Sequence, residues 1–216
     1  MKHLCIYAKP PIPGRAKSRL AEDIGAEAAA DLAAALLKDL YRELLGMPGV
    51  EISLWHTPES QPEEFLGVVP ESTTFAVQEG ANLGDRMRNT CAGLLRESDN
   101  QVVIIGTDCI FHSKGSIAEA FRLLEGANVV LQPAEDGGYV LVGQSQFCGE
   151  MFDGVEWGTE KVFAQTLSKL DRSDCSYCLM PMTFDIDVQD DLSRLVEGLD
   201  PGRHLHTSAW VERTLA

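Results

Sequence analysis

Short apolar runs alternate with longer helical stretches along most of this chain, and no other feature of the sequence constrains the fold as strongly. The runs have the length and apolar content of buried strands, and they occupy 3–8, 50–55, 73–77, 102–105, 128–131, 139–142 and 178–182. Apolar residues recur every three or four positions, as in amphipathic helices, around 25–46, 87–95, 117–124, 163–170 and 192–196. Strands alternating with helices indicate βαβ units, so the sequence predicts an α/β fold with a largely parallel sheet covered on both faces.

The length of 216 residues is compatible with one domain. No internal repeat, low-complexity tract or linker divides the chain. A chain of this size buries enough surface on folding to be stable without disulfides or a structural metal ion. We therefore expect a single domain over residues 1–216.

The charge balance restricts the partners. The chain has 33 acidic residues against 18 Lys and Arg, a net charge of −15, whereas nucleic acids and anionic membranes attract a broad positive field. A small anionic ligand remains compatible, because it needs only a few converging cations. No apolar segment is long enough for a signal peptide or a membrane helix. We expect a cytoplasmic protein with no nucleic-acid partner and no membrane insertion.

The six cysteines are scattered through regular segments and lack the spacing of a disulfide framework. Cys175 and Cys178 have the spacing of a redox or zinc motif, but no second cysteine pair accompanies them. The sequence therefore predicts reduced, unligated thiols.

A basic loop, KPPIPGRAKSRL at residues 9–20, follows the first apolar run. It contains Lys9, Arg15, Lys17 and Arg19, while its prolines and Gly14 prevent a helical start. Backbone N–H groups and these cations can converge on one anion, for which phosphate is the obvious choice. Charge alone fits a solvated basic turn equally well. The chain has no Walker-type phosphate loop.

Asp108 stands shortly after the buried run 102–105. In open α/β sheets, ligands bind outside the carboxyl ends of the strands. A divalent cation such as Mg²⁺ takes one or two carboxylates and completes its shell with phosphate oxygens and water, so Asp108 is a candidate metal ligand. The alternative is a cap for the helix that begins near Ser113 or Ser116.

A second acidic segment, Asp185-Ile186-Asp187, follows the run 178–182. In an extended segment the two carboxylates share one side, where one can join Asp108 on a metal. Taken by itself, the pair Asp187 and Asp190 fits the N-terminus of the following helix better.

The segment between the runs 128–131 and 139–142 contains Asp136, two glycines and Tyr139. Glycines allow the backbone to approach a ligand closely, and the carboxylate and hydroxyl are groups that can move protons. A tight hairpin turn explains the Asp-Gly pair equally well.

Five motifs occur in order between residue 3 and about residue 197. They are Lys9-Pro10…Gly14…Lys17-Ser18-Arg19-Leu20, Gln78-x-Gly80…Leu83-Gly84-Asp85-Arg86-Met87, Gly106-Thr107-Asp108-Cys109, Pro133-Ala134-x-Asp136-Gly137-Gly138-Tyr139 and Trp157-x-Thr159. As an ordered set they resemble a bacterial family of proposed glycosyltransferases, domain of unknown function 2064 or selenodomain-associated transferase 1. This family belongs to the GT-A-like nucleotide-diphospho-sugar transferase superfamily. The sequence departs from its usual Thr-Asp-Cys-Pro at Ile110.

The resemblance implies a three-layer α/β/α sandwich, Rossmann-like, with a mostly parallel mixed sheet. It places the nucleotide in residues 1–110 and the acceptor in about 111–200, leaving 201–216 as a C-terminal tail. The residues carried over for nucleotide and phosphate are Lys9, Gly14, Arg15, Lys17, Arg19, Gln78, Gly80 and Arg86, with Gln78 and Gly80 near the base. It implies that Asp108 and Asp187 bind the metal ion, Mg²⁺ or Mn²⁺, and that Asp136 and Tyr139 lie on the acceptor side.

The expected function is metal-assisted glycosyl transfer from a nucleoside diphosphate sugar to an unidentified small-molecule acceptor. A close alternative is a nucleotidyltransferase that attacks the α-phosphate of an NTP, because the AKSRL segment also resembles 2-phospho-L-lactate guanylyltransferases. A third is a nucleotide-binding protein that keeps the fold without turnover.

Overall fold

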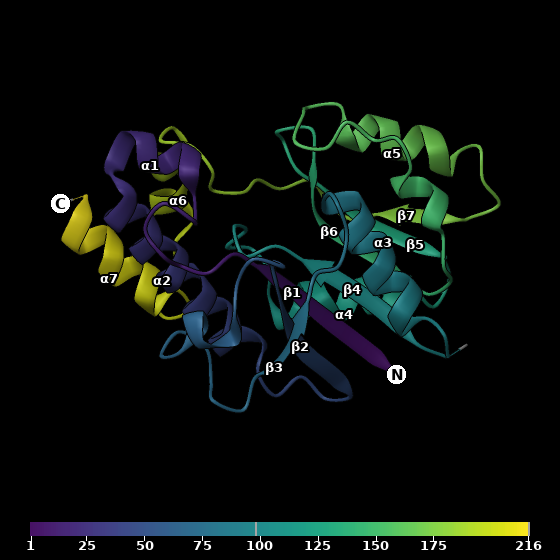
Figure 1. Cartoon of the computed structure of the whole chain (residues 1–216), viewed down its shortest axis with the longest axis horizontal. Coiled ribbons are helices and arrows are strands. Elements are labelled where there is room, and N and C mark those ends of the chain that lie inside the picture. Colours follow the sequence, from purple (N-terminus) through teal and green to yellow (C-terminus); the bar gives the residue numbers. More distant parts are fainter. Residues whose placement is uncertain (98, 216) are drawn as a thin grey trace.

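The computed structural model describes residues 1–97 and 99–215, which form one seven-stranded sheet flanked by helices (Figure 1). The strand order across the sheet is β3-β2-β1-β4-β6-β5-β7, and β6 alone of these strands runs antiparallel to its neighbours. The strands are β1 (Lys2–Ala8), β2 (Val50–His56), β3 (Thr74–Val77), β4 (Gln101–Ile105), β5 (Val129–Pro133), β6 (Tyr139–Gln144) and β7 (Tyr177–Leu179). The expected mostly parallel mixed sheet is confirmed.

The helices of the described part are α1 (Ser18–Ile24), α2 (Ala26–Leu44), α3 (Leu83–Leu94), α4 (Lys114–Leu123), α5 (Val162–Leu170), α6 (Asp191–Gly198) and α7 (Leu205–Thr214). Two short 3₁₀ helices, η1 (Pro62–Phe65) and η2 (Gly149–Phe152), lie in connections. Helices α2 and α4 pack on one face of the sheet, and α3, η2 and α5 pack on the other. The predicted α/β/α sandwich is therefore confirmed.

Side-chain alternation along the central strands builds the two core layers. In β1, Leu4 and Ile6 face α2 and α4, whereas Cys5 points to the opposite layer with α3. In β4, Val103 and Ile105 likewise face α2 and α4. Strands apolar on both sides are typical of a sheet buried between two helical layers, so β1 and β4 form the centre of the molecule.

A third apolar cluster holds α1, α2, α6 and α7 together at one end of the molecule, at the left of Figure 1. It surrounds Trp210 of α7, which is 1% exposed, and includes Ile110 and Ile186 from segments near the sheet edge. Helix α7 lies within residues 201–216, the segment expected from the sequence to be a C-terminal tail.

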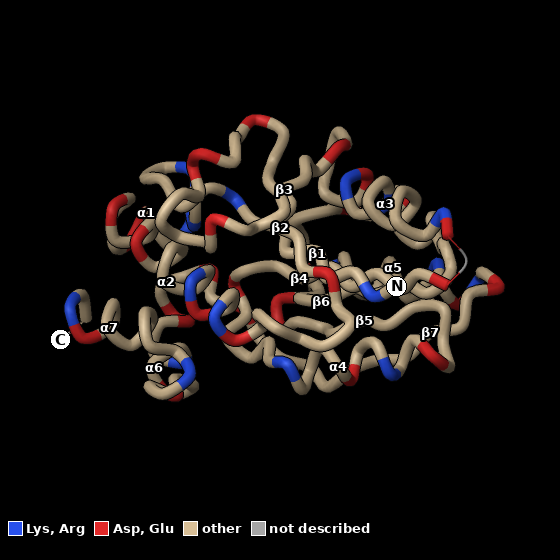
Figure 2. The backbone as a smooth tube through the Cα atoms, turned by 90° about the horizontal axis from the view of Figure 1, so that it is seen from below, with Lys and Arg blue, Asp and Glu red and all other residues tan. Residues whose placement is uncertain are grey.

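Two sequence expectations differ from the structure. Cys148 and Cys175 form a disulfide, so the prediction of six reduced thiols is wrong for this pair, because the residue before η2 and a residue two positions before β7 meet in space. The run predicted as a strand at 178–182 contributes only its beginning to β7. No described helix is long and apolar enough to cross a membrane. Asp and Glu are spread over most elements, with Lys and Arg between them (Figure 2).

Candidate active site

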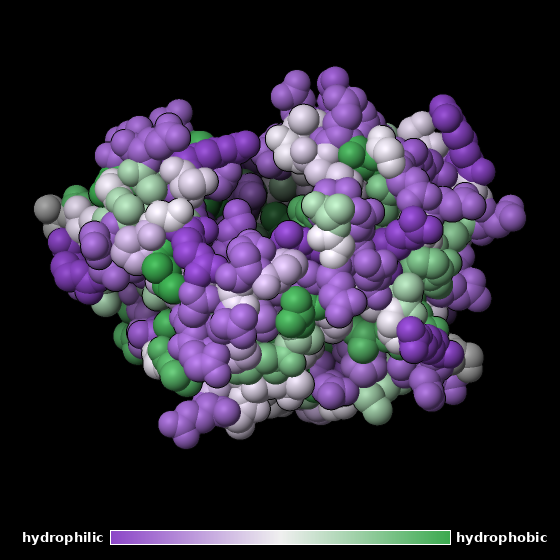
Figure 3. All heavy atoms as spheres, viewed as in Figure 1, coloured by the Kyte–Doolittle hydropathy of each residue, from purple (hydrophilic) through white to green (hydrophobic). Residues whose placement is uncertain are grey.

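A cleft opens where the order of the sheet reverses direction. The chain proceeds from β1 to β2 on one side, and returns to place β4 on the other side of β1, so the loops after β1 and β4 diverge and leave a crevice. Two adjoining cavities occupy this place, of about 690 Å³ (the larger cavity) and about 430 Å³ (the smaller cavity). Both are lined by Tyr7, Lys9, Ser18, Leu83, Gly106 and Asp187. Figure 3 shows the surface hollowed between the two ends of the molecule.

The smaller cavity is lined by three of the expected nucleotide-binding cations, Lys9, Lys17 and Arg86. Gln78, which follows β3, is 3% exposed and donates from Nε2 to the Trp55 carbonyl at 2.6 Å. Gly80 accepts a long hydrogen bond of 3.4 Å from Nε of Arg86. Four of the predicted nucleotide residues, Lys9, Lys17, Gln78 and Arg86, thus come together from separate segments around the smaller cavity.

Lys17 occupies a position that the charge pattern alone does not predict. Its side chain is 3% exposed, and its Nζ donates to Asp108 Oδ1 and to the Ile186 carbonyl, both at 2.5 Å. Among the described non-glycine residues it alone has a positive φ, 48°, a left-handed conformation that costs roughly 1–2 kcal/mol. The fold therefore holds this ammonium group against the expected metal ligand.

Arg19 makes the corresponding contact on the other acidic segment, from Nη1 to Asp187 Oδ2 at 3.0 Å. Both expected metal ligands are consequently paired with expected phosphate-binding cations. Arg15 points elsewhere: it pairs with Glu64 of η1 and donates to the Glu59 carbonyl. Neither Arg15 nor Gly14, which has φ +78° in the same turn, lines either cavity.

The acidic residues of the cleft come from four segments, the fourth being 157–160 with Glu160. Asp136, Asp185 and Asp187 line the larger cavity and Asp108 the smaller one. Burial, with the charges of Asp136 and Asp108, raises the pKa of Asp185 from 3.8 to about 6. Within residues 1–97 and 99–215, no three His, Cys, Asp or Glu side chains form a ready metal cluster. Two carboxylates still fit a Mg²⁺ or Mn²⁺ ion that takes its other ligands from phosphate and water.

The capping alternatives for these aspartates are wrong. Helix α4 is capped by Ser113, whose side chain accepts from the Ser116 N–H in a capping box. At α6 the Asp190 side chain makes no cap hydrogen bond, and Asp191 accepts from the N–H groups of Asp187 and Val188 at 2.9 Å each. The carboxylates of Asp108 and Asp187 are therefore left to face the cleft.

The Asp136 segment is both a turn and a part of the cavity. It connects the antiparallel strands β5 and β6, and Asp136 Oδ1 accepts from the Gly138 N–H at 2.8 Å. Gly137 has φ +88°, and a Cβ there would lie 2.1 Å from the Glu160 carbonyl oxygen, so only glycine allows the 157–160 segment to approach. Tyr139 lines the cavity with its ring, while its hydroxyl is buried and its pKa is raised by desolvation.

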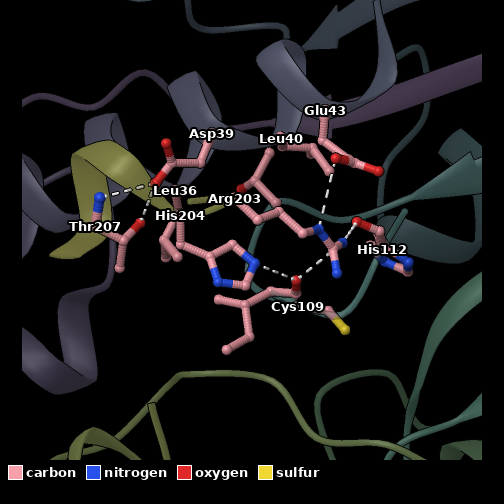
Figure 4. Close-up of a pocket in the computed structure, with 11 residues that line it drawn as sticks. Leu36, Asp39, Leu40, Glu43, Cys109, His112, Arg203, His204 and Thr207 are labelled. Carbon is pink, nitrogen blue, oxygen red and sulfur yellow. Dashed lines mark hydrogen bonds and ion pairs between the residues drawn. The ribbon is translucent and has the colours of Figure 1, made fainter. Parts of the chain in front are cut away.

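Sequence reasoning missed the residues that hold the Asp108 loop from behind (Figure 4). Arg203, just before α7, donates to the carbonyl of His112, and His204 Nε2 lies 3.1 Å from the carbonyl of Ile110. A cavity of about 10 Å³ lies between them and α2, roughly the space of one water molecule. Burial lowers the pKa of His112 to about 4. No local motif signals these contacts, because about 90 residues separate the partners.

Solved structures share this fold. A "putative nucleotide-diphospho-sugar transferase" from Desulfovibrio desulfuricans G20 is 26% identical with a TM-score of 0.88, over 98% of this chain and 94% of the other. A CMP:2-keto-3-deoxy-manno-octonic acid synthetase complexed with CTP is 10% identical with a TM-score of 0.57, over 96% of this chain and 99% of the other. Rv0371C complexed with manganese, from Mycobacterium tuberculosis H37Rv, is 16% identical with a TM-score of 0.51, over 92% and 98%.

No curated protein matches the chain. The sequence profile of one family matches residues 40–159, which include β2 to β6 and the Asp108 and Asp136 loops of the cleft. That family is described as an uncharacterized protein conserved in bacteria. Because the match covers more than half of the 216 residues of this chain, the chain belongs to the DUF2064 family.

Proposed function

We propose that this protein transfers a glycosyl group from a nucleoside diphosphate sugar to a small acceptor, with the help of a divalent metal ion. The observation that carries the proposal is the division of the cleft. Lys17 and Arg86 line only the smaller cavity and Asp136 and Asp185 only the larger one, while Lys9 borders both. Cations on one side suit a diphosphate, and carboxylates on the other suit an acceptor that must lose a proton.

The cations stabilise the departing diphosphate. Lys9, Lys17 and Arg86 bind its oxygens in the smaller cavity, with Arg19 at the border and Gln78 near the base. Their charges are already in place when negative charge grows on the leaving group, so little reorganisation is required. A metal held by Asp108 and Asp187 would supply further charge neutralisation.

The carboxylates serve the acceptor. Asp136 lies at the surface of the larger cavity, and we assign it the role of the base that accepts the proton of the attacking hydroxyl. Its hydrogen bond from the Gly138 N–H orients the carboxylate. The ring of Tyr139 stands in the cavity wall beside it.

Calorimetry with a panel of nucleoside diphosphates, with and without Mn²⁺, tests the proposal. We expect Mn²⁺ to strengthen binding of at least one nucleotide to the wild type by tenfold or more, and Asp108→Asn to remove that gain. Asp153→Asn is the matched control, because Asp153 is ion-paired with Arg88 at 2.9 Å but does not line either cavity. Equal Mn²⁺ dependence in Asp108→Asn and wild type would contradict the metal assignment.

Nucleotidyl transfer is the second candidate, favoured by the likeness in fold to a synthetase complexed with CTP. It uses the same cations but breaks the bond between the α- and β-phosphates. The products separate the two reactions, since nucleotidyl transfer releases pyrophosphate and glycosyl transfer releases a nucleoside diphosphate. Tight nucleotide binding without either product across a broad acceptor panel would favour a binding protein without turnover.

A further inference from the structure

The larger cavity has an apolar wall that phosphate binding does not explain. The wall consists of the rings of Tyr7, Tyr139 and Trp157 with the side chains of Leu83 and Met87. Leu83, at the first turn of α3, is 46% exposed and so offers apolar surface to this cavity. An apolar part of a ligand that packs on this wall would be removed from water, and this burial would strengthen binding.

The two tyrosines present only their rings to the cavity. The Tyr7 hydroxyl is engaged inside the protein, 2.7 Å from Thr90 Oγ1 and 3.0 Å from the Arg86 carbonyl to which it donates. The Tyr139 hydroxyl is buried. Desolvation raises the pKa of both phenols. Neither hydroxyl is turned to the cavity, so this wall recognises shape and apolar surface.

Trp157 is fixed in this wall by the absence of a side chain on α3. A Cβ at Gly84 would lie 2.3 Å from Trp157 Nε1 and 2.4 Å from Cε2, so the indole packs directly on the helix backbone. Tyr139 meets the indole edge-on, at 6.3 Å between ring centroids and 85° between planes. The wall is therefore built before any ligand arrives, which favours binding of a rigid partner.

The larger cavity also has polar side chains in its lining. Asp136 and Glu160 line it from neighbouring segments, because the Gly137 turn packs on the 157–160 segment. A cavity of about 690 Å³ with one apolar wall and a few carboxylates is of the size that holds drug-sized organic ligands. An acceptor that offers only hydroxyl groups would leave the wall without a partner.

We propose that the acceptor is an uncharged hydroxyl compound with an apolar ring, whose ring packs on Trp157 and Leu83 while its hydroxyl reaches Asp136. This inference rests on the proposed function. Four carboxylates line the larger cavity against the two cations Lys9 and Arg19, and this excess of negative charge disfavours an anionic acceptor, since like charges repel and desolvation is costly. Of this wall, Met87, Tyr139 and Trp157 line the larger cavity and not the smaller one, so the Trp157–Gly84 contact acts on the acceptor rather than on the nucleotide.

Ligand-observed NMR with matched alcohol pairs tests this proposal. The probes are 2-phenylethanol against ethanol and 3-phenylpropanol against propanol, titrated into wild type saturated with its best-binding nucleoside diphosphate. We expect each phenyl compound to bind at least tenfold more tightly than its partner. Gly84→Ala should abolish this preference by displacing Trp157. Gly93→Ala is the control in the same helix, because a Cβ at Gly93 meets no atom within 4 Å.

Leu83→Asn provides a second variant that needs no repacking, because Leu83 is already partly exposed. It should reduce the phenyl preference several-fold, measured on protein saturated with nucleotide, because Leu83 also lines the smaller cavity. Equal binding of phenyl and alkyl probes to wild type overturns the inference, and so does a loss of nucleotide affinity in Gly84→Ala that accompanies the loss of phenyl binding. Failure of wild type to bind any nucleotide instead contradicts the proposed function, so the two failures are distinguishable.

Discussion

Lys17 combines backbone strain, burial and charge at one residue. Replacement by methionine keeps the length of the side chain but leaves the buried Ile186 carbonyl without its donor, so Lys17→Met should lower the free energy of unfolding by about 1–3 kcal/mol. Arg19→Met is the matched comparison, because Arg19 is 64% exposed and its ion pair with Asp187 should contribute under about 1 kcal/mol. Urea denaturation of both variants measures the difference. Similar losses for both would contradict the structural role of Lys17.

The folded protein disfavours the charged form of the Asp185 carboxylate. Its pKa rises from 3.8 to about 6. Between these two pH values, the carboxyl group keeps its proton in the folded protein and has lost it in the unfolded chain. The stability contributed by the protonated group is therefore present below the unfolded pKa and lost as pH rises through about 6. Asp185→Asn should raise the free energy of unfolding by about 1–3 kcal/mol near pH 7 and by much less near pH 4.

Denaturation in urea across this pH range, with EDTA present, measures the effect. Asp190→Asn is the control, because Asp190 is exposed and lines neither cavity. A pH-independent gain in Asp185→Asn would mean that a change of shape, rather than charge, is responsible. Stability gained at the cost of binding is common where function needs an unfavourable charge.

At the scale of elements, α7 depends on a carboxylate from another helix. Asp39 of α2 is 4% exposed and accepts from the N–H groups of His206 and Thr207 at 3.0 and 2.8 Å, at the start of α7. Asp39→Ala should therefore lower the free energy of unfolding by about 2–3 kcal/mol. Asp31→Ala should cost under about 1 kcal/mol, because Asp31 meets Arg213 of the same α7 at the exposed surface.

The comparison of Asp39 with Asp31 can be followed by hydrogen exchange of the α7 amides. Because Arg203 and His204 contact the carbonyls of the Asp108 loop, loosening of α7 should also accelerate exchange in residues 108–112. Rapid exchange confined to α7 would show that the two segments are not mechanically coupled.

For the whole molecule, local patterns predict the layers but not the distant pairings. The strands and most helices follow from apolar periodicity, and the cleft follows from the rule for strand ends. The contact of Lys17 with Asp108 joins residues 91 positions apart, and no local rule selects one cation from the four in the loop. Trp157 on Gly84 is a similar case, because its close packing arises only after α3 and the 157–160 segment meet.

The disulfide is the pairing that sequence reasoning missed most clearly, and it tests the arrangement of the whole molecule. Cys148 and Cys175 are 27 positions apart, so closing this loop should stabilise the folded state by about 3–4 kcal/mol through the unfolded chain. The variant with both Cys148→Ala and Cys175→Ala should unfold at lower urea concentration, with nucleotide binding retained, because neither residue lines the cavities. Cys178→Ala, at a free cysteine, is the control. Thiol titration of the unreduced, unfolded protein should find the four free cysteines, Cys5, Cys91, Cys109 and Cys178, and a count of six would contradict the pairing.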